Sequence, residues 1–110
     1  MLGIDVEILR YAEDCQPGWV ECRFIDASGK EHRFLEKAPV VSASHLHAGS
    51  SYPQAGILGC TVLGRRLDDD GHQVVTVDTE RPWGIESTAG RSQFDVRPEQ
   101  LLEFAHAPAG

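Results

Sequence analysis

The sequence predicts an all-β domain, a small single-domain barrel of about six or seven short antiparallel strands. Two hairpin signatures support this prediction, because in each a pair of apolar-alternating runs flanks an acidic turn that contains glycine. The first spans Trp19 to Phe34 around Asp26–Lys30, and the second spans Gly56 to Val77 around Asp68–Gly71. Helical patterns are confined to one or two turns at the margins. A barrel, OB-like or SH3-like, is preferred to a sandwich, although both protect sheet edges.

The N-terminal part contains three expected strands. Ile4–Ile8 alternates apolar and acidic residues, which is typical of a half-buried strand, and Glu13–Gly18 ends in a Pro-Gly turn. In Trp19–Ile25 every second residue from Val20 is apolar, which predicts an inward face. His32–Glu36 is expected to return beside that strand as its hairpin partner.

The central part is the least regular. Ala38–Val41 is predicted to be a short extended piece, because Pro39 is typical of an edge or of the start of a strand. Ser42–Leu46 is expected to form one helical turn capped by serine. His47–Pro53 is interpreted as a loop.

The C-terminal part contains the second hairpin and its neighbours. Gly56–Leu63 is expected to be a strand whose glycines mark bulges, and Gln73–Val77 is the clearest strand in the chain. Pro82–Glu86 is predicted to be a further short strand, and Ser92–Val96 the last one. Pro98–Phe104 is expected to form one or two helical turns, with proline at an allowed first position.

Length and charge limit the function classes. The 110 residues predict one domain over residues 1–104, followed by a flexible tail over residues 105–110. The 17 acidic and 10 basic residues give a net charge of −7, which disfavours nucleic acids and anionic membranes and is compatible with a basic protein partner. No apolar run approaches the ~20 residues that span a bilayer. Three unpatterned cysteines favour a reducing cytoplasm.

No metal or cofactor is predicted. His45 and His47 form a possible ligand pair, but no third ligand lies nearby in sequence, and Cys60 or His72 would have to approach through the fold. The Asp68–Gly71 turn resembles a calcium loop only superficially, because strand residues follow it in place of the remaining ligands.

Catalytic patterns are also missing, so the protein is expected not to be an enzyme. Cys22 and Cys60 occupy inward strand positions, where cysteine acts as a small apolar residue, while Cys15 lies in a turn. The serines near His45 and His47 lack a nucleophile-elbow frame, and no phosphate-binding loop occurs.

Aromatic residues beside proline or glycine are the candidate partner-binding residues. Trp83 either plugs one end of the barrel or anchors a partner, since tryptophan is enriched at binding hot spots. A polar rim around Trp83 and two further aromatic corners complete this set: Glu80, Arg81, Glu86, Trp19 and Tyr52.

The leading hypothesis is a non-catalytic, acidic protein-binding module, and its most specific version is an inhibitor or immunity-type protein that neutralises a basic enzyme. One alternative is a small ligand- or metal-binding barrel, or an enzyme, that uses the His45–Tyr52 loop. The other is a homo-oligomer, such as a homodimer paired through Val74–Val77.

Overall fold

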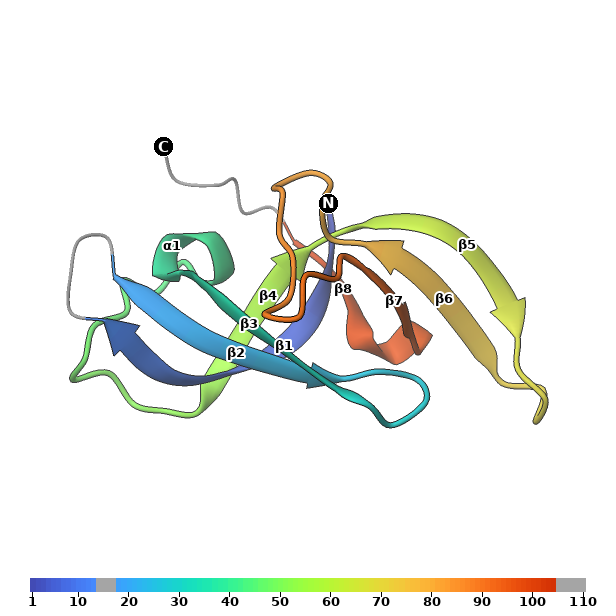
Figure 1. The fold of residues 1–110 in the computed structure, drawn as a ribbon, viewed down its shortest axis with the longest axis horizontal. Helices are drawn as coiled ribbons and strands as arrows, with labels where there is room; N and C mark the ends of the chain where they lie inside the picture. The colour runs from blue at the N-terminus through green and yellow to red at the C-terminus, as the bar shows by residue number, and fades with distance from the viewer. Residues whose placement is uncertain (14–17, 105–110) are drawn as a thin grey trace.

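The computed structural model describes residues 1–13 and 18–104, and its strands form two antiparallel sheets (Figure 1). The larger sheet has the order β3-β2-β1-β4, and β8 also pairs with β1. The smaller sheet has the order β5-β6-β7. The elements are β1 (Leu2–Glu13), β2 (Trp19–Ile25), β3 (Glu31–Lys37), α1 (Ala38–Val41), β4 (Gln54–Gly59), β5 (Thr61–Leu67), β6 (Gln73–Asp78), β7 (Gln93–Val96), η1 (Pro98–Gln100) and β8 (Leu101–Glu103).

Both predicted hairpins and the all-β class are confirmed. In the first hairpin Cys22 lies opposite Phe34, so the inward faces of β2 and β3 coincide. In the second, β5 pairs with β6 from Thr61 to Leu67, with a register shift between Val62 and Gly64. The expected strand over Gly56–Leu63 is two strands, because the chain leaves the larger sheet at Cys60 and enters the smaller one.

Of the three predictions for the central region, the loop over His47–Pro53 is confirmed and the other two are wrong. Ala38–Val41 is one turn of helix rather than an extended piece, because Pro39 occupies a first-turn position where its missing N–H removes no bond. Ser42 is extended and closes that turn by donating its backbone N–H to the carbonyl of Ala38. The expected helical turn over Ser42–Leu46 is absent, and His45 adopts a positive φ of 45°.

Three C-terminal predictions also need correction. Pro82–Glu86 is turn and loop, and Gly84 there has a φ of +67°, which does not fit a strand. Only Pro98–Gln100 is helical, as a single 3-10 turn. Leu101–Glu103 is a strand instead, because its backbone pairs with Leu2–Ile4 of β1, so Ser92–Val96 is not the last strand. The part of the chain that the structure describes therefore holds eight strands rather than six or seven.

The core lies between the inner faces of the two sheets. Alternate residues of β1, β2 and β3 meet buried residues of β6 and β7, with Phe24, Phe34 and Phe94 in mutual ring contact. Cys22 and Cys60 are buried as predicted, and burial raises the pKa of their thiols to about 12 and about 11.

Across residues 1–13 and 18–104 the two sheets do not join into a closed barrel. None of the helices in these ranges is both long and apolar enough to cross a membrane. Most of the predicted turn at Glu13–Gly18 lies outside the described residues. The whole of the predicted tail, residues 105–110, also lies outside them. Cys15 lies outside them too.

Candidate functional site

The outer face of the larger sheet carries a ladder of alternating charges across β1, β2 and β3. Each member of the ladder is joined to the next by an ion pair of 2.7–3.5 Å, in the order Glu7, Arg23, Glu31, Arg33, Glu21 and Arg10. Three arginines thus balance three glutamates. Because these groups are partly exposed to solvent, such pairs add little stability, and the ladder leaves little net charge for a partner.

An acidic groove begins where this ladder ends. It has a volume of about 550 Å³ and lies between the middle of β1, the end of β2, the start of β4 and the η1 turn. Three carboxylates line it, those of Asp5, Glu7 and Glu99, against the single guanidinium of Arg23. Glu7 is paired with Arg23, whereas Asp5 and Glu99 have no ion pair among the described residues.

Apolar atoms complete the acidic groove. Ile25 lies two residues beyond Arg23 on the same face of β2, and 43% of its surface is exposed. Pro53 and Ala55 form the side toward β4. Gln100 holds the η1 side in place, because its amide donates to the carbonyl of Ile25 at 2.7 Å. The groove therefore combines unpaired carboxylates with exposed apolar surface.

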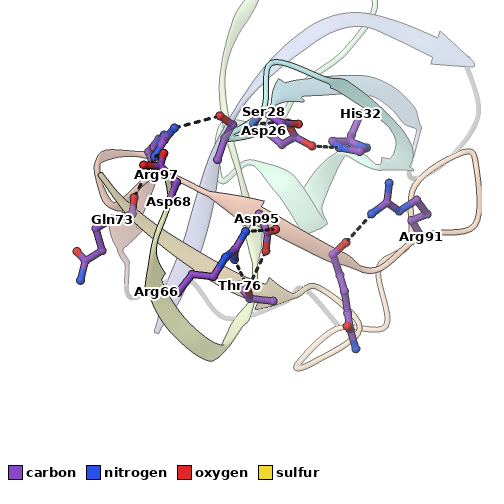
Figure 2. Close-up of polar contacts among 12 residues, drawn as sticks. Asp26, Ser28, His32, Arg66, Asp68, Gln73, Thr76, Arg91, Asp95 and Arg97 are labelled. Atoms are coloured by element: carbon purple, nitrogen blue, oxygen red, sulfur yellow. Dashed lines mark hydrogen bonds and ion pairs between the residues drawn. The ribbon is translucent and has the colours of Figure 1, made fainter. Parts of the chain in front are cut away.

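A second groove, the arginine groove, lies on the smaller sheet against the β2–β3 and β5–β6 turns and has a volume of about 540 Å³ (Figure 2). Four cations line it, namely Lys30, Arg66, Arg91 and Arg97, with three carboxylates, namely Asp26, Asp68 and Asp95. The β2–β3 turn is attached to β7 by a backbone hydrogen bond from Ala27 to Asp95 of 2.8 Å.

Two of these arginines are held by carboxylates. Arg66 donates to Asp95 at 3.0 Å, and Arg97 donates to Asp68 at 2.8 Å (Figure 2). The pKa of Asp95 is lowered by its hydrogen bonds from Arg66 and then Thr76. The pKa of Asp68 is lowered first by the backbone N–H of His72 and then by Arg97. These carboxylates are therefore ionised at neutral pH and fix the guanidinium groups.

Asp26 organises the wall formed by the β2–β3 turn. Its Oδ1 accepts hydrogen bonds from the backbone of Ser28 and Lys30 and from the Ser28 hydroxyl at 2.8–3.0 Å, and its Oδ2 lies 2.8 Å from Nε2 of His32 (Figure 2). Burial alone would raise the pKa of Asp26, but the bonds from His32, Ser28 and Lys30 outweigh burial and lower it to about 2.

This arrangement does not match a catalytic triad. In a triad the histidine lies between nucleophile and carboxylate, whereas here Asp26 lies between Ser28 and His32. His32 is 5% exposed and packs against the rings of Phe24 and Phe94. With its low pKa, Asp26 does not act as a general acid or base at neutral pH. Its hydrogen bonds to Ser28 and Lys30 stabilise the β2–β3 turn, and its contact with His32 attaches that turn to the core.

The β5–β6 turn brings Asp68, Asp70 and His72 together, with one ligand atom from each lying within 4.8 Å of the others. Both oxygens of Asp68 are already used, since Oδ1 accepts the N–H groups of Asp70 and His72 and Oδ2 accepts Arg97. The hydrogen bonds to Asp68 therefore stabilise the β5–β6 turn and the position of Arg97.

The predicted corner at Trp83 is partly a packing feature. Trp83 is half-buried, and its ring lies 5.6 Å from that of Phe104. A Cβ added at Gly59 would lie 3.0 Å from the Trp83 ring, so the glycine makes room for the indole. Glu80, Arg81 and Glu86, the predicted rim, are exposed.

The other predicted residues are dispersed. Trp19 is half-buried on β2, with the Lys37 ammonium 5.8 Å from its ring centre. Tyr52 donates its hydroxyl to the carbonyl of His47 at 2.7 Å. His45 and His47 are exposed, and Nδ1 of His47 accepts the N–H of Gly49. Neither histidine lines either groove.

Neither groove is predicted by the sequence. Asp5, Ile25 and Glu99 lie in three separate elements, and no spacing links them. The Asp26 turn was recognised, but its contact with Asp95 and Arg97 depends on packing between the sheets. Comparisons with protein-family models, with curated proteins and with solved structures find no match to this chain.

Proposed function

We propose that this protein is a non-catalytic binding module that recognises a basic segment of a protein partner through the acidic groove. The observation that carries the proposal is that Asp5 and Glu99, which have no ion pair within residues 1–13 and 18–104, lie beside the exposed side chain of Ile25. Carboxylates without internal cations are free to accept lysine or arginine, and an adjacent apolar side chain covers the methylene stem of such a residue.

The surrounding charges support this choice of face. The ladder on β1, β2 and β3 is internally balanced, so electrostatic attraction on this side of the molecule is concentrated at the groove. The net charge of −7 steers a basic partner toward the protein as a whole. An inhibitor or immunity-type protein is the most specific version of this function.

The test combines a defined cationic probe with a matched pair of variants. Hexalysine titrated into ¹⁵N-labelled protein is expected to shift the amide signals around Asp5, Ile25 and Glu99 saturably. Asp5→Asn with Glu99→Gln should weaken binding by about tenfold or more, because two charge-assisted contacts are lost. Asp69→Asn with Asp70→Asn removes the same charge from an exposed turn outside the acidic groove and should leave the affinity within about twofold.

Affinity capture then links the groove to a protein partner. The proposal is supported if the wild type and the Asp69→Asn, Asp70→Asn control both recover the same partner from native lysate. The Asp5→Asn, Glu99→Gln variant should fail to recover it. Equal weakening by both variant pairs in the hexalysine titration would mean that only net charge matters, which contradicts it.

Self-association through β5 is the second candidate function. Among residues 1–13 and 18–104, no strand pairs with the outer side of β5, and Leu63 and Leu67 on it are 51% and 68% exposed. Such an edge is a template for pairing with another strand. A homodimer paired through Val74–Val77 is not supported, because these residues belong to β6, which already pairs with β5 on one side and β7 on the other.

Sedimentation measurements test this candidate. A wild-type dimer that dissociates in Leu63→Lys with Leu67→Lys, and persists in the control Leu102→Lys on β8, would support it. A monomer at every concentration would eliminate it.

At the level of the fold, we propose an open SH3-like barrel rather than an OB-like one. The support is that η1 directly precedes the last strand, and that this strand returns to pair with β1. An experimental structure in which Leu101–Glu103 pairs elsewhere would contradict this proposal.

A further inference from the structure

We propose that the arginine groove is a separate binding site for an anionic group, a carboxylate or a phosphate. Its lining carries four cations and three carboxylates, a formal charge of +1, on a chain whose net charge is −7. The Debye length is about 8 Å at physiological salt, so an anion inside the groove interacts mainly with these local groups. The groove is thus a cationic site on an acidic protein.

The guanidinium groups of the arginine groove are positioned before any ligand arrives. Arg97 is held by Asp68 at 2.8 Å and by the carbonyls of Gln73 and Ala27 at 3.3 Å. Arg66 is held by Asp95 at 3.0 Å (Figure 2). An arginine has five N–H donors, and these contacts leave some of them unused in both residues. Side chains that are already ordered lose less entropy when they bind a ligand.

Lys30 and Arg91 supply the charge that an anion would neutralise. Neither has an ion pair with any carboxylate in residues 1–13 or 18–104. Arg91 donates to the carbonyl of Gln93 at 3.4 Å (Figure 2). Its guanidinium lies 5.8 Å from the ring centre of Phe94. Arginine forks match the spacing of carboxylate and phosphate oxygens.

The walls of the groove favour a ligand larger than a single ion. The volume of about 540 Å³ lies within the range of small-molecule sites. Asp26 fixes one turn through its bonds to Ser28 and Lys30, and Asp68 fixes the other through its bonds to Asp70 and His72. Two rigid turns that flank fixed cations form a preorganised site for an anion-bearing side chain or small molecule.

The test is a titration of ¹⁵N-labelled protein with inorganic phosphate in one arm and glutarate in the other. Saturable shifts at the amides of Ala27, Ser28 and Asp95 are expected in at least one arm. Saturation at lower concentration with inorganic phosphate assigns the ligand as a phosphate, and saturation at lower concentration with glutarate assigns it as a carboxylate. Hexalysine should not shift these amides, so failure of this site and failure of the acidic groove are separate results.

A matched pair of double variants completes the experiment. Lys30→Gln with Arg91→Gln should weaken anion binding by about tenfold, because both unpaired cations are removed. Lys37→Gln with Arg65→Gln removes the same charge from exposed positions outside the groove and should change affinity by less than about twofold. Circular dichroism checks that all variants fold. The absence of saturable shifts in both arms, or equal weakening by both pairs, would overturn the proposal.

Discussion

Arg97 binds Asp68 across 29 residues of sequence, with Nη1 donating to Oδ2 at 2.8 Å. The same side chain donates through Nη2 to the carbonyl of Ala27 in the other turn, at 3.3 Å. One guanidinium therefore joins the β2–β3 turn to the β5–β6 turn. Because these turns form walls of the arginine groove, Arg97 links the stability of the fold to the shape of that groove.

Replacing Arg97 should loosen both turns. Arg97→Met keeps the length of the side chain but removes the bonds to Asp68, Gln73 and Ala27. We expect the melting temperature to fall by on the order of 5 °C, measured by calorimetry. Arg65→Met, at an exposed position on β5, should change it by less than about 1 °C. Equal melting temperatures for the two variants would show that the link contributes nothing.

Asp26 should make stability depend on pH in acid. Its pKa is lowered from 3.8 to about 2 in the folded protein. The stability that the ionised Asp26 adds to the fold is therefore complete above about pH 4 and is lost as the pH falls toward 2. That shift corresponds to about 2 kcal/mol of unfolding free energy. In urea unfolding, Asp26→Asn should lower the free energy at pH 6 by about that amount and flatten the change between pH 4 and 2. The exposed Asp69→Asn should keep the wild-type profile.

Gly59 should tolerate no side chain without displacing Trp83. An added Cβ would lie 3.0 Å from two ring atoms of the indole. We expect Gly59→Ala to cost about 1–2 kcal/mol and to shift Trp83 fluorescence to the red in a Trp19→Phe background. Gly64→Ala on β5 is the control, since a Cβ there meets no atom within 4 Å. An unchanged spectrum in Gly59→Ala would contradict this packing.

The two buried cysteines should be inert in the folded protein. Burial raises the thiol pKa to about 12 for Cys22 and to about 11 for Cys60, and the thiolate is the reactive form. In a Cys15→Ser background at pH 8, Ellman's reagent should react with neither thiol until urea unfolds the chain. Rapid reaction of either thiol before unfolding would mean that the core opens locally.

The local sequence determined the features that depend on neighbouring residues. Period-two alternation in the sequence predicts the inward face of β2, because side chains on a strand alternate between two sides. The Asp26 and Asp68 turns were recognised from their acidic and glycine content, since such residues bond their own backbone. Burial of Cys22 and Cys60 followed from the same alternation and is confirmed.

Only the tertiary structure decided what depends on distant partners. Leu101–Glu103 is a strand because Leu2–Ile4 offers its backbone, although the local sequence favours helix. Asp5 and Glu99 share one groove, and Arg97 reaches both turns, because the two sheets pack together. Propensity acts over a few residues, whereas strand pairing and charge clustering are set by contacts between segments far apart in the chain. The elements were therefore largely readable from the sequence, and both grooves were not.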